Sequence, residues 1–517
     1  MNRHAWRFYG PALVLATAPA VTAANMYVAS TPLLLQELLR DLGITLLVAT
    51  IVAIIVALSP GRHSEKGAAF TLLVVAAGVY PALADAAGVG PCTWGDTALG
   101  TAFLGALVVA LVGANRLAPG LLEGLHGLAW LGAVALLLYA GYSVGVRAIR
   151  AYRAPDRSAL GGLPVILDRS RPAPDIIHII FDGMGRLDEL HDDYGIDTVA
   201  ARRSLDAEGL RISTNAVANY AQTYLAVSAM LSMDYLDQAR QLATGDSDRT
   251  LPEAIITQST VLRALKARGY RFTLLSSGYA ALAEHPLADD GIMGPTLVSE
   301  FEGYLLWRTI FRTLPVRAFT FVPHRDRTRA LLAALQDFAP RREPRFVLAH
   351  VMLPHPPFVF DAEGRDVTPP GLFTWADGSQ FRGTAAEFKA GYSAQARLTL
   401  ATLRDLLGRW NRLSRPPIVI VHGDHGSGLG YDMYTPVGSN TSGRMKIFLG
   451  IKGLDDASTL PKSPVNIYRE VFNQRFGTLL PVLPDRSVVS SWPKPYDWTE
   501  VHVGAPSLGP SPLHGVQ

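Results

Sequence analysis

Long apolar stretches follow one another through the first part of the chain. They cover roughly residues 8–29, 42–58, 68–86, 98–114 and 125–146. Each is about 17 to 22 residues long, which at helical rise matches the hydrocarbon core of a bilayer. The pattern therefore predicts an α-helical membrane domain of about five helices over residues 1–150. A cleavable signal peptide is the alternative for the first stretch, but the later stretches of the same kind favour a retained helix.

The charges between these stretches predict how the chain crosses the membrane. Basic residues occur before the first stretch, between the second and third, and after the fourth (Arg3, Arg7, Arg62, His63, Lys66 and Arg116). The alternate loops are mainly acidic (Glu37, Asp41, Asp85 and Asp96). Because basic loops remain in the cytoplasm, five spans place the N-terminus inside and everything beyond Arg147 outside. This is the topology of a multi-pass protein in a bacterial-type cytoplasmic membrane with an extracytoplasmic domain.

One cluster of charges argues against this orientation. Four arginines directly follow the fifth stretch, on the side that the charge rule assigns to the exterior (Arg147, Arg150, Arg153 and Arg157). Four or six spans would instead turn the rest of the chain inward. The outside placement remains the favoured prediction because the other loops agree with it.

A different pattern follows a linker over residues 151–174 that is rich in proline, glycine and arginine. Runs of β-branched and apolar residues, typical of buried strands, occur at Ile176–Phe181, 270–275, Arg345–Val351, Ile418–His422 and 445–450. Helical segments separate several of these runs, so we expect an α/β layer fold over residues 175–500. The glycine-, proline- and serine-rich tail, residues 501–517, is predicted to be disordered.

End signals mark two of the intervening helices. Ser259 is placed to cap a helix that ends at Gly269. Thr384 and Glu387 form a possible capping box for a long helix that reaches about Trp410. These signals support the alternation of helix and strand.

The composition agrees with a chain that lies partly in lipid. Its 517 residues are 49% hydrophobic and only 18% charged, and the mean hydropathy is +0.19. Soluble enzymes are usually more charged. The net charge of +3 gives no reason to expect a nucleic-acid partner. The single cysteine, Cys92, excludes an intramolecular disulfide and a multi-cysteine zinc site.

Residues with catalytic potential occur at strand ends and at one helix start. Asp182 follows the first strand, the pair Asp424-His425 follows IVIVH, and Thr223 begins a helical run, where free N–H groups favour an anion. This N/O set suits Zn²⁺ or Mn²⁺, with Mg²⁺ or Ca²⁺ as alternatives, and a bound metal would hold and polarise the Thr223 oxygen. Taken singly, each residue also has an ordinary structural explanation. Thr223 could be a helix cap, Asp182 could begin an Asp-Gly turn, and Asp424-His425 could be a solvated pair in a loop.

Four motifs in order resemble a known family. They are IIFDG, NYAQTYLAVSAML, LPHPPF and GDHG. The chain from about residue 175 to 476 resembles the alkaline phosphatase/sulfatase superfamily, in particular its membrane-anchored branch of lipoteichoic acid synthases and lipid A phosphoethanolamine transferases. The resemblance implies a sulfatase-like α/β/α sandwich that binds one or two metals and works through a covalent intermediate on a hydroxyl.

The resemblance also implies roles for individual residues. Asp182, Asp424 and His425 match the metal ligands, and Thr223 matches the nucleophile, which is also a ligand. His355 in LPHPPF resembles the histidine that contacts the transferred group or protonates the leaving oxygen.

Other histidines and some family features match less well. His350 and His422 lie near the motifs without a clear counterpart, and His422 and His178 are interpreted as core histidines in buried strands. The chain has no Cys or Ser in a C/S-x-P-x-R context, which counts against sulfate ester hydrolysis. The absence of cysteine from the large domain favours phosphoglycerol-transferase-like members over disulfide-rich phosphoethanolamine transferases.

The favoured prediction is a membrane-bound, metal-dependent phosphoryl-group transferase. It would take a phosphoglycerol or phosphoethanolamine group from a membrane phospholipid onto Thr223 and pass it to a glycan or lipid of the cell envelope. The alternative at the same site is a sulfatase-like hydrolase, either a phosphodiesterase or a sulfuric ester hydrolase. A third interpretation is a non-catalytic domain that binds a partner.

Overall fold

The computed structural model describes most of the chain. The described residues are 3–18, 21, 35–58, 63–89, 94–117, 119–152, 160, 164–243, 249–293, 309–313, 317–369, 373–455 and 459–503. Residues 153–159 and 161–163 of the predicted linker and most of the predicted disordered tail lie outside them.

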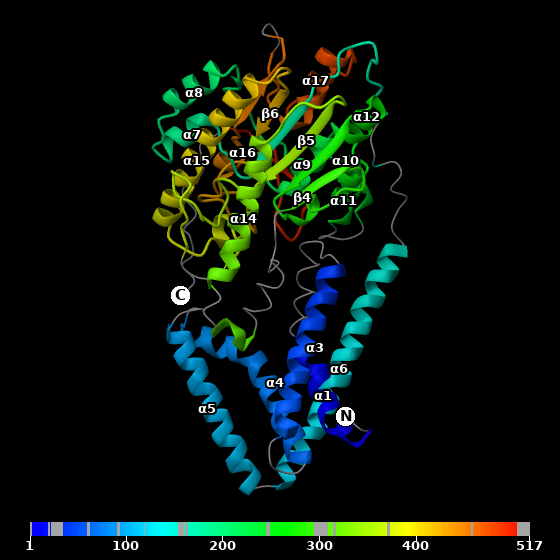
Figure 1. The fold of residues 1–517 in the computed structure, drawn as a ribbon, viewed down its shortest axis with the longest axis vertical. Coiled ribbons are helices and arrows are strands. Elements are labelled where there is room, and N and C mark those ends of the chain that lie inside the picture. The colour runs from blue at the N-terminus through cyan, green and yellow to red at the C-terminus, as the bar shows by residue number, and fades with distance from the viewer. Residues whose placement is uncertain are drawn as a thin grey trace.

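The N-terminal part consists of long helices below a large domain (Figure 1). They are α1 (Arg3–Ala16), α3 (Leu35–Leu58), α4 (His63–Ala86), α5 (Trp94–Leu117) and α6 (Pro119–Tyr152). Among the described residues, one segment, Lys66–Ala86, is long and apolar enough to cross a membrane. The number of spans therefore stays a prediction.

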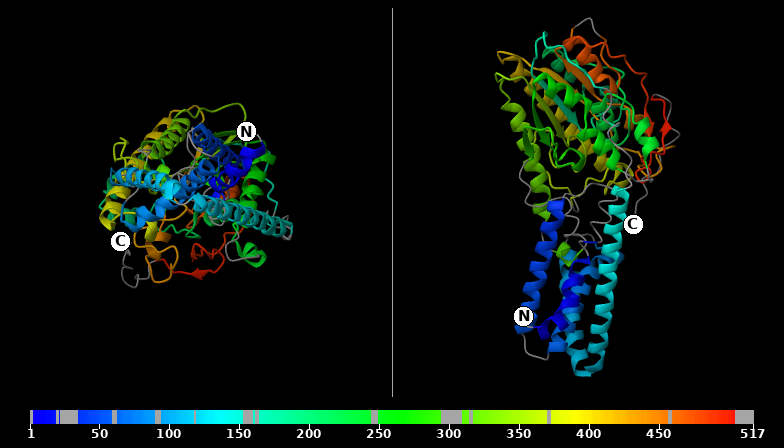
Figure 2. Two further views of the ribbon diagram at one scale, coloured as in Figure 1. Left: turned by 90° about the horizontal axis from the view of Figure 1, so that it is seen from below. Right: turned by 90° about the vertical axis from the view of Figure 1, so that its right-hand side faces the viewer.

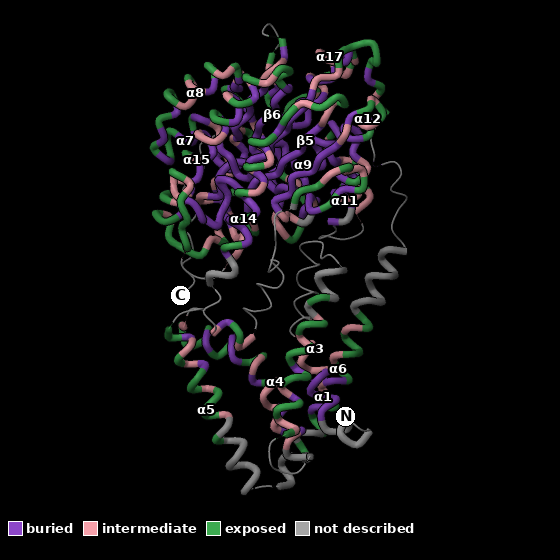
Figure 3. Tube along the Cα trace, viewed as in Figure 1, coloured by how far each residue is buried: buried purple, intermediate pink, exposed green. Residues whose placement is uncertain are grey.

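Many of the described residues of these helices are exposed (Figure 3), and several of the exposed residues are large and apolar. Leu58 on α3 is 81% exposed, and Leu131 and Leu138 on α6 are 67% and 70% exposed. Large apolar side chains exposed in this number are unfavourable in water and indicate contact with an apolar medium or partner. This is the surface expected of helices that contact lipid.

The described residues of the large domain form two sheets. Its strands are β1 (Ile176–Phe181), β2 (Arg211–Ile212), β3 (Arg271–Ser276), β4 (Asp290–Met293), β5 (Arg345–Val351), β6 (Ile418–His422), β7 (Leu449–Lys452), β8 (Val488–Val489) and β9 (Thr499–Glu500). The main sheet has the order β2-β7-β6-β1-β5-β3-β4. Its five strands from β6 to β4 are parallel, whereas β7 and β2 are paired antiparallel.

Helices cover both faces of this sheet (Figures 1 and 2). They are α7 (Leu187–Asp192), α8 (Thr198–Ala207), α9 (Thr223–Ser232), α10 (Asp237–Leu242), α11 (Thr250–Thr257), α12 (Thr260–Arg268), α14 (Arg317–Gln336), α15 (Ala385–Asn411), α16 (Thr441–Met445) and α17 (Ile467–Phe476). Alternate residues of β1 divide between two cores: Ile180 packs with α9, α12 and α17, whereas Ile179 packs with α7, α14 and α15. The large domain is therefore a three-layer α/β/α sandwich with a mostly parallel sheet.

The structure confirms several predicted elements. The strands β1, β5 and β6 have the predicted bounds. Ser259 accepts a hydrogen bond from the Leu262 N–H at the start of α12, and the capping box of Thr384 with Glu387 begins α15. The strand expected at residues 445–450 is displaced. It begins at Leu449 because α16 occupies the preceding residues through Met445.

Helix α9 begins at Thr223, as the helical run there predicts, and it is buried on every side. All ten of its residues are buried, so no face of it contacts solvent. It packs between the main sheet core and a smaller core that includes Leu251 of α11. Burial on every side fixes the position of its N-terminal residue, Thr223.

Candidate active site

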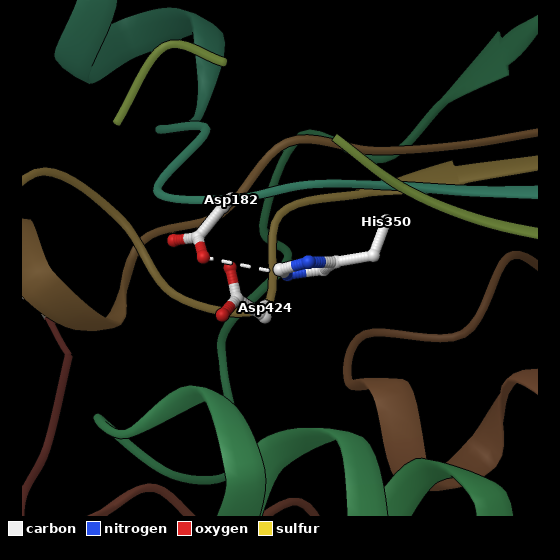
Figure 4. Close-up of side chains that lie close together, drawn as sticks. All are labelled: Asp182, His350 and Asp424. Atoms are coloured by element: carbon white, nitrogen blue, oxygen red, sulfur yellow. Dashed lines mark ion pairs between the residues drawn. The ribbon is translucent and has the colours of Figure 1, made fainter. Parts of the chain in front are cut away.

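The site lies at the carboxyl edge of three neighbouring strands, β6, β1 and β5. Asp182 directly follows β1, the pair Asp424-His425 follows β6, and His350 is the penultimate residue of β5. Because these strands are parallel and adjacent, their ends meet at one edge of the sheet. Figure 4 shows the side chains of Asp182, His350 and Asp424 converging there.

The converging groups are close enough to share one ion. The ligand atoms of Asp182, His350 and Asp424 all lie within 4.8 Å of one another. Nε2 of His425 lies 3.4 Å from Asp182 Oδ1 and 3.4 Å from Asp424 Oδ2. All four side chains are buried. The structure thus brings together every carboxylate and imidazole that the sequence predicts as a ligand, and it adds His350.

Thr223 is the first residue of α9 and faces the same centre. Its Oγ1 lies 3.3 Å from His425 Nε2, and its side chain is buried. The preceding residue, Gln222, is the N-cap in an extended conformation, and its side-chain amide donates to the backbone carbonyl of Ser490. The hydroxyl therefore sits at a rigid helix N-terminus, where the helix dipole favours negative charge.

The hydrogen bonds of His425 make it suited to bind a cation. Its Nδ1–H donates to the Gly426 carbonyl at 2.9 Å, so in the neutral ring Nε2 carries a lone pair. That lone pair faces two carboxylates, and Asp182 Oδ1 and Asp424 Oδ2 have no hydrogen-bond partner among the described residues. Buried acceptors turned toward one another are unfavourable without a positive charge between them. The residues present fit a divalent cation, and their N/O donors suit Zn²⁺ or Mn²⁺.

The electrostatics keep these groups in the states that bind metal. Burial alone would raise the pKa of Asp182, but His355, His350 and His425 around it lower that pKa below its ordinary range. Burial, and then the nearby Arg444, lowers the pKa of His425. The carboxylate is thus ionised and the imidazole neutral at neutral pH, as metal binding requires.

His355 lies on the loop that follows β5, beside the same cluster. Its Nδ1–H donates to the Pro356 carbonyl at 2.6 Å. Its Nε2 lies 4.0 Å from Asp182 Oδ1 and 3.8 Å from Asp377 Oδ2. The ring therefore presents Nε2 toward the centre, where it can exchange a proton with a reacting oxygen.

Three residues at the site were not predicted from the sequence. His350 lies near the motifs without a clear counterpart in them, although a polar residue at the end of a buried strand is itself a signal. Asp377 and Arg444 form a buried ion pair. Arg444 also donates to the Ala221 carbonyl at 3.0 Å, and its Nη2 lies 3.0 Å from His425 Nε2. No periodic pattern marks Asp377 or Arg444, because both lie outside the strands and long helices.

The remaining buried histidines of this region lie in the strands. Nδ1 of His178 and the Tyr468 hydroxyl are 2.6 Å apart. His422 donates its Nδ1–H to the Gly423 carbonyl, and burial lowers its pKa to about 4. Both side chains are fully buried in the sheet. Their positions agree with the interpretation of core histidines.

Solved structures resemble the chain at low sequence identity, whereas no family model and no curated protein matches it. The zinc complex of the C-terminal periplasmic domain of EptC from Escherichia coli is 13% identical over 61% of this chain and 87% of that chain, with a TM-score of 0.40. The integral membrane lipooligosaccharide phosphoethanolamine transferase EptA from Neisseria meningitidis is 13% identical over 90% of this chain and 95% of that chain, with a TM-score of 0.39. An alkaline phosphatase superfamily protein from Vibrio parahaemolyticus is 10% identical over 65% and 79% of the two chains, with a TM-score of 0.37.

Because these TM-scores are low, the chemistry of the site rests on its own geometry.

Proposed function

We propose that the protein is a membrane-bound, metal-dependent phosphoryl-group transferase that forms a covalent phosphothreonine at Thr223. The observation that carries this proposal is the position of the Thr223 hydroxyl. It lies at the N-terminus of a fully buried helix, 3.3 Å from His425 Nε2 and next to buried carboxylates. The hydroxyl is a possible nucleophile, and the cation site and the helix dipole next to it both favour negative charge. Together these features suit attack on a phosphate ester.

Asp182, Asp424, His425 and Thr223 would hold the divalent cation, Zn²⁺ or Mn²⁺, with His350 beside them. When bound, such an ion lowers the pKa of the threonine hydroxyl and neutralises charge on the transferred group. Arg444 holds the Ala221 carbonyl and Asp377, so it fixes the backbone just before Thr223.

The proposed reaction has two displacements at the same phosphorus. The reaction starts with the Thr223 proton lost to solvent and with His355 protonated on both ring nitrogens. Thr223 Oγ1 attacks the donor phosphate, and the bond to the leaving lipid alcohol breaks as His355 Nε2 gives its proton to that alcohol, which leaves the ring neutral. His355 then takes the proton of an acceptor hydroxyl, which attacks the phosphothreonine and releases Thr223. Positioning and charge stabilisation supply most of the catalysis in phosphoryl transfer.

The N-terminal helices support a phospholipid donor of the phosphoglycerol or phosphoethanolamine type and an acceptor in the cell envelope. Their exposed apolar surface suits lipid, which would keep the site near such a donor. We further propose a cytoplasmic-membrane location with residues 1–150 in the membrane and residues 175–500 outside. In support, Asp85 and Asp96, from a loop predicted to be outside, contact Arg312 of the large domain.

Intact-mass spectrometry tests the proposal directly. Wild type and Thr223→Ala would be incubated with vesicles of phosphatidylethanolamine or phosphatidylglycerol, with Mn²⁺, with Zn²⁺, or with a chelator. We expect an adduct on the wild type alone and only with metal, and its mass would identify the headgroup. Thr223→Ser is the matched variant that should retain the adduct.

Other outcomes would count against the proposal in different ways. An adduct on Thr223→Ala would exclude Thr223 as the nucleophile. Rapid release of the headgroup to water from the wild type, without transfer to any added alcohol, would support the hydrolase alternative. A protein that binds no metal would contradict both.

A further inference from the structure

A segment near the C-terminus packs against the start of helix α9. We call residues 486–492 the strap. The Val488 N–H donates to the Asn219 carbonyl at 2.9 Å, and the Asn219 side-chain amide donates to the Arg486 carbonyl at 3.0 Å. Two distant parts of the chain therefore meet directly before the proposed nucleophile, Thr223.

Gln222 is the residue at which the strap meets α9. Its backbone carbonyl accepts from the N–H groups of Leu225 and Ala226 at 3.1 and 3.0 Å, which closes the first turn of the helix. Among the described residues, its side chain makes no capping hydrogen bond to α9. The side-chain amide instead donates toward three oxygens of the strap, which are the carbonyl and hydroxyl of Ser490 at 3.1 Å and the carbonyl of Ser491 at 3.2 Å. One residue thus holds the helix with its backbone and the strap with its side chain.

The Gln222 side chain has partners for both ends of its amide. Its Oε1 accepts a hydrogen bond from the Tyr224 hydroxyl at 2.6 Å. Gln222 is 5% exposed and Ser490 is 4% exposed. At a buried position water cannot replace a lost partner, so an amide turned away from these groups is left unpaired at a large cost. The amide is therefore confined to one orientation.

A buried arginine holds the end of the strap. Arg249 is the N-cap of α11, and its Cζ lies over two rings, 5.0 Å from the centroid of Tyr224 and 4.3 Å from that of Trp492. Its guanidinium also donates to the Trp492 carbonyl. The Trp492 N–H in turn donates to the carbonyl of Met433, between β6 and α16, at 2.6 Å. The strap is thus fixed on both sides of Ser490, so it provides a rigid support for Gln222.

This support acts on the residue that follows Gln222. The Thr223 hydroxyl lies 3.3 Å from His425 Nε2, and a shift of the first turn of α9 would move it away from the cation site. A misplacement of about 1 Å can slow an enzymatic reaction about 100-fold.

We propose that Gln222 is a positioning residue, which uses the strap to hold the Thr223 hydroxyl beside the cation site. The strap lies beyond residue 476, where the resemblance of the four motifs ends, so the resemblance assigns it no role. This inference rests on the proposed transferase function and adds to it a residue that acts through the nucleophile.

The test compares two variants of Gln222 with a matched control in the full-length enzyme. Gln222→Met removes the amide at nearly the same side-chain length. Gln222→Asn is too short to reach the strap, but asparagine is a favoured N-cap, so the helix and the fold should be kept. The control is Asn466→Leu. Asn466 is also a buried amide at a helix N-cap, and it pairs with the backbone N–H and carbonyl of Leu483, outside the strap.

Three quantities would be measured for each protein. Quench-flow mass spectrometry gives the rate of adduct formation on Thr223 over a range of concentrations of phosphatidylglycerol or phosphatidylethanolamine vesicles with Mn²⁺. Urea denaturation gives the stability. Hydrogen exchange gives the opening rate of the first turn of α9 through the amides of Leu225 and Ala226.

We expect both Gln222 variants to lower the maximal rate of adduct formation about tenfold or more. The vesicle concentration that gives half of the maximal rate should not change, because the buried amide does not contact the lipid. The amides of the first turn should exchange about tenfold faster. Asn466→Leu should lose stability as Gln222→Met does, but it should react and exchange at the wild-type rates.

Two results would overturn the inference. A wild-type rate of adduct formation in both Gln222 variants would show that the strap does not position the nucleophile. Equal slowing by Asn466→Leu would show that the rate follows overall stability. If Gln222→Met does not fold, Gln222→Asn decides. If the wild type forms no adduct, the transferase proposal fails, and the exchange of the first-turn amides still decides whether the strap holds α9.

Discussion

At the residue scale, the same local hydrogen bond orients three histidines. His355, His422 and His425 each donate Nδ1–H to the carbonyl of the next residue. The bond sets the tautomer, so Nε2 of the neutral ring carries the lone pair. At His425 and His355, that nitrogen faces the proposed cation site. The orientation of these rings is therefore fixed by backbone atoms next to them and does not depend on distant parts of the fold.

Arg444 depends on distant partners, and this leads to the first prediction. Its guanidinium reaches Asp377, the Ala221 carbonyl and His425 Nε2 at once. A lysine has one compact ammonium and cannot span all three. We expect Arg444→Lys to slow adduct formation roughly tenfold or more, because a charge-assisted hydrogen bond contributes about 1.5–3 kcal/mol. Quench-flow mass spectrometry measures the rate.

The matched control for Arg444→Lys is Arg365→Lys. Arg365 pairs with Asp361 on the surface, where its side chain is 75% exposed, so the control should react at the wild-type rate. If Arg444→Lys also reacts at that rate, the ion pair with Asp377 does not position the site.

A second residue-scale prediction concerns the pH dependence of stability. Burial, then Arg327, lowers the pKa of His324 from 6.5 to about 3 in the folded protein. Between these values the unfolded chain binds one proton more, so the free energy of unfolding decreases as the pH falls from 6.5 toward 3. One group contributes at most about 1.4 kcal/mol per pH unit. His324→Asn should therefore lose less stability on acidification than the wild type.

Urea denaturation at pH 6.5, 5.5 and 4.5 would measure this difference in slope. His191→Asn, at an exposed position on α7, is the control and should follow the wild type. Parallel curves for wild type and His324→Asn would mean that His324 does not remain neutral on folding.

At the element scale, the turn after β6 depends on glycine for close packing. An ideal Cβ on Gly426 would lie 2.1 Å from the Gly443 carbonyl oxygen and 2.4 Å from that of Lys446. Real Cβ atoms do not approach so closely, and backbone atoms cannot move aside as a flexible side chain can. The turn that directs Asp424 and His425 into the site is thus packed against the backbone of α16 and of the residue that follows it.

The third prediction follows from this packing. Gly426→Ala should destabilise the protein by about 1–3 kcal/mol, as overpacking does, and should weaken metal binding by displacing His425. Differential scanning calorimetry with and without Mn²⁺ measures both effects. Gly408→Ala is the control, since Gly408 lies within α15 and a Cβ there meets only the flexible Glu208 side chain at 3.4 Å. Equal stability of Gly426→Ala and the wild type would contradict the packing argument.

Local signals explain which elements could be predicted from the sequence. Strands β1, β5 and β6 are continuous apolar runs, and α12 and α15 begin with capping residues. The short strands β2 and β4 at the sheet edges carry no such run. Helix α14 contains a proline, and polar residues are scattered among its apolar ones. Its sequence therefore gives no clear helical pattern. Its position is determined by packing against β4, β5 and α15.

Some residues of the candidate site could also be predicted from the sequence, and others could not. Asp182, Asp424 and His425 were predictable because they directly follow recognisable buried strands. Asp377 and Arg444 come from segments 67 residues apart and meet only in the folded chain. Long-range contacts of this kind leave no periodic trace in the sequence, so the ion pair could be found only in the structure.

At the scale of the whole molecule, one buried arginine packs a segment from between β4 and α14 against the N-terminal helices. Arg312 belongs to a short 3-10 helix, η3 (Ile310–Thr313), and its side chain is fully buried. It pairs with Asp85 at 2.8 Å and with Asp96 at 3.4 Å, where α4 ends and α5 begins. Thr97 also donates to the backbone carbonyl of Thr313 at 2.8 Å. These contacts attach η3 to the N-terminal helices α4 and α5.

The last prediction is that Arg312 matters for lipid substrates only. Arg312→Ala leaves the buried Asp96 without this charge partner, and breaking a buried ion pair costs about 3–5 kcal/mol, so the contact with η3 should be lost. The large domain keeps its own core, since neither sheet-facing cluster includes Arg312. Hydrolysis of soluble bis-p-nitrophenyl phosphate should therefore remain normal, whereas turnover of phospholipid in vesicles should fall at least tenfold.

Arg404→Ala, at an exposed arginine of α15, is the control and should affect neither rate. An equal fall in both rates would mean that Arg312 stabilises the site itself, and unchanged lipid turnover would mean that its contact does not position the large domain at the membrane.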